Sequence, residues 1–130
     1  MARFNRHQLL AVFAGGVVGG LLRVWLGLHF VSAPTSWPWV IFVINITGSF
    51  ALCCFTRLHE RLPQSTYRHP FLGTGLCGAY TTFSTMQIEL LKMLDADRIG
   101  TALSYAFASV GVGLLAIWLA SALMRRAGIA

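Results

Sequence analysis

Charged residues are scarce in this sequence, and acidic ones are scarcer still. Only 11% of the 130 residues are charged, whereas 56% are hydrophobic, and four residues are Asp or Glu. So few charges cannot cover the surface of a soluble domain of this length. The composition therefore predicts a small all-α membrane protein, because long apolar stretches cross a bilayer as helices.

The chain also lacks the motifs of the common enzyme classes. It contains no Walker loop, dinucleotide-binding glycine fingerprint, nucleophile elbow or acid pair placed for general acid–base catalysis. Glu89 is the only acid near an apolar run, whereas a proton-coupled transporter normally carries one deep in a span. We therefore expect no enzyme. The net charge of +6 comes from arginines between apolar runs, which suits lipid headgroups rather than nucleic acid.

Metal-binding and disulfide patterns are missing too. No cysteine or histidine has the spacing of a zinc site, a disulfide framework or a helical ligand pair. The cysteines are expected to act as small apolar residues. The histidines lie near the ends of apolar runs and are expected to be solvated loop residues. The residues concerned are Cys53, Cys54, Cys77, His7, His29, His59 and His69.

What the chain does contain is a set of apolar runs, each long enough to span a membrane. Four such runs are predicted as transmembrane helices, at approximately 9–31, 39–56, 71–93 and 99–124. We expect the whole chain, residues 1–130, to form a single transmembrane domain.

The first run has glycines at a spacing of four, which favours close packing of another helix. These glycines are Gly15, Gly16, Gly19 and Gly20.

Two polar residues inside apolar runs each have two interpretations. Arg23 either extends to the membrane interface or faces an aqueous vestibule. Asn45, in the middle of the second run, either hydrogen-bonds a neighbouring helix or offers an amide donor to a permeating anion.

The third run is the least regular. Its stretch Gly73–Thr85 carries glycines spaced two and three apart, followed by hydroxyl residues, and such residues weaken a helix. Broken helices are tolerated in hydrocarbon where they are buried in protein or line a cavity, and they often mark ion or substrate sites. We therefore expect the third span to be interrupted near its middle and to carry the functional site.

Beyond the interruption, helical spacing gives two neighbouring stripes. Thr82, Thr85 and Glu89 share one face. Phe83 and Met86 form the stripe beside it, for which packing alone is a sufficient explanation.

Three segments together resemble the Fluc/CrcB fluoride channel family. They are Gly-Gly-Leu-Leu-Arg at Gly19–Arg23, Asn45-x-x-Gly48, and Gly-x-Cys-Gly-Ala-Tyr-Thr-Thr-Phe-Ser-Thr at Gly75–Thr85. The resemblance implies a multi-pass protein of the bacterial inner membrane that forms an antiparallel, dual-topology dimer. It implies that the dimer exports cytoplasmic fluoride passively through two pores, which protects against fluoride toxicity, and holds a structural sodium ion at its centre.

The resemblance also implies roles for individual residues. Gly78 and Thr81 match positions whose backbone carbonyls hold the sodium, Asn45 matches the pore amide, and Arg23 matches the vestibule arginine. Phe83 matches the first phenylalanine of an aromatic box, but Met86 stands where the family commonly has the second. Further positions match the polar track of the pore: Ser84, Thr85, Glu89, Tyr105 and Ser109.

Two other functional classes fit a four-span protein of this length. A small multidrug-type transporter needs a membrane-embedded glutamate, which the first span lacks. In a non-transporting assembly subunit, Asn45, Thr82 and Thr85 would serve only as interhelical contacts. Liposome efflux of fluoride, compared with chloride and a lipophilic cation, separates these classes.

The distribution of basic residues bears on topology. Most of them flank the runs on the side of the two chain termini, which favours cytoplasmic termini. A dual-topology homodimer requires near balance, so a heterodimer with an oppositely oriented subunit is the alternative. We favour the homodimer because Gly78 and Thr81 are both present for a symmetric sodium site.

Overall fold

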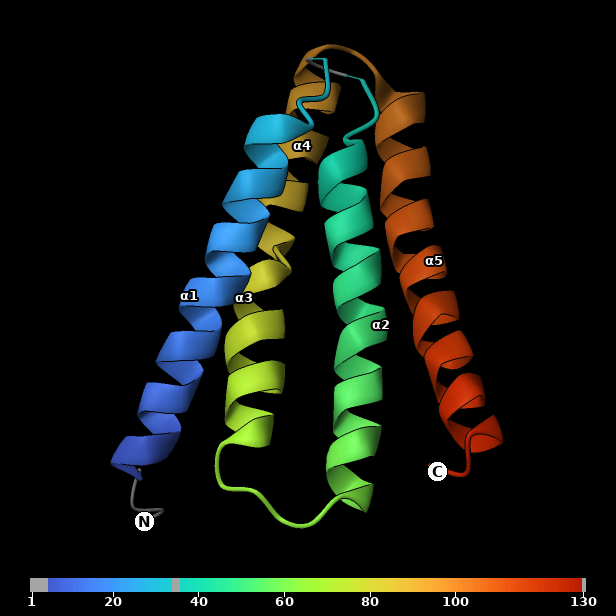
Figure 1. Cartoon of the computed structure of the whole chain (residues 1–130). Helices are drawn as coiled ribbons and strands as arrows, with labels where there is room; N and C mark the ends of the chain where they lie inside the picture. Colours follow the sequence, from blue (N-terminus) through green and yellow to red (C-terminus); the bar gives the residue numbers. More distant parts are fainter. Residues whose placement is uncertain (1–4, 34–35, 130) are drawn as a thin grey trace.

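The computed structural model describes residues 5–33 and 36–129. These residues form helices and connecting segments without a strand, which confirms the all-α class. The start of α1, the 62–69 connection and the end of α5 lie at one end of the molecule, and α4 joins α5 at the other (Figure 1). The elements in chain order are α1 (Arg6–His29), α2 (Trp39–Arg61), η1 (Pro70–Cys77), α3 (Gly78–Tyr80), α4 (Phe83–Asp95) and α5 (Ile99–Arg126).

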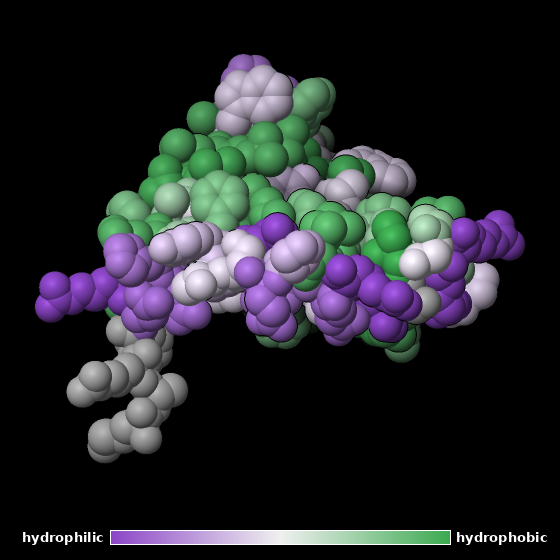
Figure 2. Space-filling model, turned by 60° about the horizontal axis from the view of Figure 1, so that its bottom comes forward, coloured by the Kyte–Doolittle hydropathy of each residue, from purple (hydrophilic) through white to green (hydrophobic). Residues whose placement is uncertain are grey.

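Three of the helices are long and apolar enough to cross a membrane. They are α1, α2 and α5, with 24, 23 and 28 residues, and about 20 residues suffice to span the hydrocarbon core. Large apolar side chains point outward from α1 and α5, including Phe13, Leu28 and Phe107. Hydrophilic residues gather at the end that holds the 62–69 connection, with hydrophobic surface along the helices beyond it (Figure 2). The chain is an integral membrane protein that crosses the bilayer several times.

The segment between the 62–69 connection and α5 consists of shorter pieces. η1 is a π-helix of 8 residues, α3 has 3 residues and α4 has 13. A π-helix is wider than an α-helix and is most often found at functional sites. The glycine-rich part of the third run is therefore helical, although not regularly α-helical.

Close backbone contact joins α1 to η1 through glycines. A Cβ atom on Gly15 would overlap the carbonyl oxygen of Phe71, and one on Gly19 would overlap that of Leu76. From the η1 side, a Cβ on Gly75 would lie 2.5 Å from the carbonyl oxygen of Val12. These contacts confirm the predicted close packing for Gly15 and Gly19.

The other two glycines of this repeat, Gly16 and Gly20, have more space where a side chain would stand. A Cβ on Gly16 would have one neighbour, at 4.0 Å, and one on Gly20 would have none within 4 Å. Only one face of α1 meets η1. Gly15 and Gly19 lie at the centre of that face, and Gly16 and Gly20 lie to its side.

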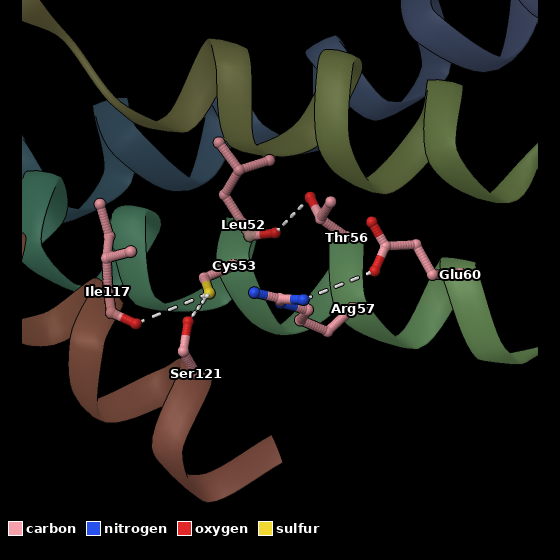
Figure 3. Close-up of polar contacts among 7 residues, drawn as sticks. All are labelled: Leu52, Cys53, Thr56, Arg57, Glu60, Ile117 and Ser121. Carbon is pink, nitrogen blue, oxygen red and sulfur yellow. Dashed lines mark hydrogen bonds and ion pairs between the residues drawn. The ribbon is translucent and has the colours of Figure 1, made fainter. Parts of the chain in front are cut away.

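α2 packs along α5, and a polar contact joins the two helices at Cys53 (Figure 3). The thiol of Cys53 lies 3.2 Å from the hydroxyl of Ser121 and donates a weak hydrogen bond to the carbonyl of Ile117, at 3.7 Å. One turn further along α2, Arg57 pairs with Glu60 of the same helix at 3.8 Å. α2 continues to Arg61, beyond the apolar run that was expected to end near residue 56.

The histidines do not all have the predicted surroundings. His7 and His29 are exposed, but His59 and His69 are half-buried. His59 lies in the last turn of α2, and the 62–69 connection brings His69 back beside it. His59 and His69 are therefore less solvated than expected, because folding brings the end of α2 beside the start of η1. His7 and His29 are solvated as expected, but they lie in α1 rather than in a loop.

Candidate functional site

The helix after the glycine stretch stops at Tyr80 and resumes at Phe83. Between them the backbone is extended, with φ −76° and ψ 154° at Thr81 and φ −149° and ψ 111° at Thr82. The break thus falls on the two threonines rather than on the glycines before them. Threonine hydroxyls compete with backbone groups for hydrogen bonds, so threonine is well suited to a helix end.

Asn45 of α2 holds this break from the side. Its Nδ2 donates to the carbonyl of Thr82 at 3.1 Å, and its Oδ1 accepts from the Thr82 amide at 2.8 Å. The primary amide therefore satisfies both polar groups of one unwound peptide residue, much as a neighbouring strand would. Of the two roles considered for Asn45, the interhelical contact is present. One N–H of Nδ2 remains beyond the bond to Thr82.

Neighbouring residues of α2 complete this support. Gly48 has no side chain where a Cβ would overlap Cγ2 of Thr81. The hydroxyl of Thr47 lies 3.1 Å from that of Tyr80, the last residue of α3. The contribution of Tyr80 was not predicted, because nothing in its local sequence indicates a hydroxyl 33 positions away.

Thr82 caps the N-terminus of α4. Its Oγ1 accepts from the amide of Thr85 at 3.2 Å, donates to the hydroxyl of Thr85 at 2.9 Å and lies 3.3 Å from that of Ser84. Three hydroxyls are thus gathered at the positive end of a helix dipole, where anions are favoured. The spacing had predicted that Thr82 shares a helical face with Thr85 and Glu89. Thr82 instead precedes the helix as its N-cap.

Two backbone carbonyls near the break have lost the amide partners of a continuous helix. In a continuous α-helix the amides of Thr82 and Thr85 would bond the carbonyls of Gly78 and Thr81. Here these amides donate instead to the side chains of Asn45 and Thr82. Gly78 is also exposed, and a Cβ built on it would meet nothing within 4 Å. The two carbonyls therefore lack the amide partners that a continuous helix would give them.

Phe83 and Met86 lie in different surroundings. Phe83 is 71% exposed. Met86 is half-buried and packs against the core of Met93, Ala102 and Tyr105. The two residues thus do not form one uniform stripe, because one side chain points out of the subunit and the other into it.

Tyr105 and Ser109 lie in the interior of the subunit. Tyr105 is fully buried, with the ring of Trp37 edge-on at 5.5 Å between ring centres. Among the described residues, neither its hydroxyl nor that of Ser109 has a hydrogen-bond partner on another helix. Buried polar atoms are rarely unpaired, so this pair of hydroxyls is a candidate lining for a polar path.

Glu89 and Arg23 occupy the outer parts of the candidate site. Glu89 pairs with Lys92 at 3.0 Å and lines, with Thr85, a cavity of about 360 Å³ between α1, α2 and α4. Arg23 is half-buried on α1, and its Nε has no partner among the described residues. The structure thus gathers Thr82 and two of the predicted site residues, Ser84 and Thr85, around the break. Arg23 lies apart from them on α1.

Known proteins are similar in sequence to this chain over almost its whole length. The family model described as CrcB-like protein, Camphor Resistance (CrcB), matches residues 10–121. The chain belongs to the CrcB family. The resemblance noted in the three sequence segments is thereby confirmed.

Curated CrcB relatives carry a consistent name. The fluoride-specific ion channel FluC 1 of Mycolicibacterium paratuberculosis is 51% identical over 97% of this chain and 96% of its own length. The protein of the same name from Mycobacterium bovis is 48% identical over 99% of this chain and 98% of its own. The fluoride-specific ion channel FluC of Rhizobium meliloti is 35% identical over 92% of this chain and 97% of its own length.

Proposed function

We propose that this chain forms a fluoride-selective channel through which cytoplasmic fluoride leaves the cell passively. The observation that carries the proposal is the near full-length identity of 48–51% to proteins named fluoride-specific ion channels. Passive export fits a chain whose only acid near an apolar run, Glu89, is paired with Lys92. The channel would protect the cell against fluoride toxicity.

The chemistry of the helix break supports the same function. Fluoride is small and strongly hydrated, so a pore must replace its water with hydrogen-bond donors. The remaining N–H of Asn45, the hydroxyls of Ser84 and Thr85 and the first amides of α4 are donors of this kind. Phe83 offers the positive edge of its ring to an anion. Tyr105 and Ser109 extend the set of hydroxyls.

The sodium site rests on the two released carbonyls. Gly78 and Thr81 offer backbone oxygens, and hard cations prefer oxygen ligands. Two carbonyls are too few for a stable site, so a second subunit supplies the other two. A bound sodium ion adds a fixed positive charge, which lowers the cost of an anion nearby.

The same surface supports the proposed antiparallel dimer. Gly78 and Phe83 are exposed in the subunit and require a partner if they are to line a central site. η1, α3 and α4 together form the fourth, interrupted crossing, because none of them is long enough alone. With α1, α2 and α5 this would give four crossings in the inner membrane of a bacterium.

A homodimer of this kind requires dual topology. Basic residues lie at the ends of α2 and α5 on the side of the 62–69 connection, which disfavours equal insertion in both directions. Tags placed at each terminus and tested for accessibility in intact cells decide the point. Uniformly cytoplasmic termini would contradict a dual-topology homodimer and favour a paired heterodimer.

The decisive experiment is ion efflux from liposomes that contain the purified protein. We expect fast efflux of fluoride, and none of chloride or of a lipophilic cation. Efflux of the cation would favour the multidrug-type transporter, and no efflux from an assembled dimer would favour a non-transporting subunit. In either case the proposed function would be wrong.

A further inference from the structure

We propose that Lys92 is a positioning residue of the fluoride path, which holds the Glu89 carboxylate and keeps the outer part of the path free of net negative charge. The inference rests on the proposed channel function and gives a role in it to a residue outside the predicted site. Lys92 lies in the last turn of α4, at the end of the subunit opposite the 62–69 connection (Figure 1).

One face of α4 leads from the helix break to this end. Thr85, Glu89 and Lys92 stand at i, i+4 and i+7, so their side chains share that face. All three line the cavity of about 360 Å³ between α1, α2 and α4. Thr85 belongs to the hydroxyl cluster at the break, and Lys92 lies roughly 10 Å further along the helix axis, at 1.5 Å per residue. Glu89 therefore stands between the hydroxyls and Lys92.

The cavity has one charged pair in otherwise uncharged walls. Among the described residues that line it, Glu89 and Lys92 alone are charged, and α1 and α2 contribute mostly apolar side chains. The Glu89 carboxylate lies 3.0 Å from Nζ of Lys92. The Glu89 side chain is 22% exposed and that of Lys92 is 56% exposed, so the lysine reaches the acid from the open side. Apolar walls screen charge poorly, so an unpaired Glu89 would repel an anion in this cavity.

The rest of this end of the molecule does not favour an anion either. Residues 89–98 hold three of the four acids of the chain and only two of its bases, Lys92 and Arg98. The end of α4 also carries the negative end of its helix dipole. Only Lys92 of the two bases lines the cavity. Lys92 is thus the residue placed to balance the Glu89 charge where the anion would pass.

A purely structural role for the pair predicts a different result. An exposed ion pair three residues apart on a helix contributes little to stability. Lys92→Met should therefore leave dimer assembly and the thermal unfolding temperature nearly unchanged. Fluoride efflux should nevertheless fall by about tenfold or more, because the unpaired Glu89 carboxylate then faces the anion.

Fluoride efflux from liposomes tests the proposal with two matched variants. Lys92→Arg keeps the positive charge and should retain most of the efflux. Arg98→Met removes a positive charge from an exposed residue at the same end of the molecule that does not line the cavity. Its efflux should stay near the wild-type level.

Chemical restoration of the charge separates electrostatics from packing. The Lys92→Cys variant is treated in detergent with a methanethiosulfonate reagent that attaches either an aminoethyl or a sulfonatoethyl group, and mass spectrometry confirms the labelling. The aminoethyl group should restore efflux, and the sulfonatoethyl group, of similar size and opposite charge, should not. Wild-type protein treated in the same way controls for labelling of Cys53, Cys54 and Cys77.

A double substitution tests whether the lysine acts through Glu89. In a Glu89→Gln background, Lys92→Met should change efflux much less, because no carboxylate remains to be balanced. The proposal is overturned if Lys92→Met conducts like the wild type, if both labels restore efflux equally, or if Lys92→Met costs the same factor in both backgrounds. These outcomes leave the channel function standing, whereas a wild-type protein without fluoride efflux would overturn the channel function and this inference together.

Discussion

The side-chain amide of Asn45 forms two hydrogen bonds with the backbone of Thr82, one to its N–H and one from Nδ2 to its C=O. This pairing takes the Thr82 amide away from the carbonyl of Gly78, which a continuous helix would engage. A single residue of α2 therefore both fixes the break before α4 and frees an oxygen at the proposed sodium site. The proposed anion site and cation site depend on the same contact.

Asn45→Asp should abolish fluoride efflux. A carboxylate still accepts from the Thr82 amide, but it loses the donor to the Thr82 carbonyl and adds a charge that repels the anion. Asn45→Ala should lower efflux by removing the donor and should also lower stability, by about 1–3 kcal/mol, because the buried groups of Thr82 lose their partner. Efflux and thermal unfolding of the two variants distinguish these effects.

The control for both variants is Ser104→Ala. Among the residues that the structure describes, the hydroxyl of Ser104 bonds only the carbonyl of Gly100 in its own helix, so its removal should change neither measurement. Efflux near the wild-type level from an assembled Asn45→Asp dimer would show that this amide does not act on the anion.

Phe83→Ile should reduce fluoride efflux much more than Met86→Ile. Only the phenylalanine offers a ring edge, and its exposed position means that the subunit keeps its stability. Met86 packs in the core, so Met86→Ile should cost stability, by less than about 1.5 kcal/mol, while most of the flux remains. Equal losses of efflux in the two variants would indicate that Phe83 serves only in packing.

Gly78→Val should prevent dimer assembly without unfolding the subunit. The backbone of Gly78 is helical, with φ −63°, so glycine is not needed there for its conformational freedom. A Cβ there would meet nothing within 4 Å in its own subunit, so we expect the added bulk to collide with the partner at the proposed central site. Size-exclusion chromatography with cross-linking measures assembly, and Thr81→Ser, which keeps both the backbone and the hydroxyl, should remain a functional dimer.

Sodium should support fluoride efflux without being transported with it. The released carbonyls of Gly78 and Thr81 supply a site for an ion that stays in place as a fixed charge. Prolonged dialysis into a large organic cation should therefore lower efflux, and added sodium should restore it. Undiminished efflux with the central site demonstrably empty would mean that the helix break serves another purpose.

Gly19→Ala should destabilise the subunit, whereas Gly20→Ala should not. A Cβ on Gly19 would overlap the backbone of Leu76 in η1, and overpacking of this kind costs typically 1–3 kcal/mol. The same change one residue later meets open space. Thermal unfolding in detergent compares the two variants directly, and equal stability would contradict the backbone contact between α1 and η1.

The sequence by itself determined the class of the protein and the parts of its site. The scarcity of charge and the long apolar runs indicated membrane helices, because a continuous apolar run of about 20 residues spans hydrocarbon as a helix that satisfies its own backbone groups. The glycines at Gly15 and Gly19 indicated a close helix contact, and the hydroxyl stretch indicated where a helix would be weak. These are local properties of composition and spacing, which need no knowledge of the fold.

Only the tertiary structure decided which of the available contacts form. The break falls at Thr81 and Thr82 because Asn45, 37 positions from Thr82, competes for its backbone groups. Met86 lies in the core and Phe83 outside it because α5 covers only one side of α4. His59 and His69 meet because the 62–69 connection turns the chain back on itself. Each outcome depends on a partner distant in sequence, and local propensity carries no information about that partner.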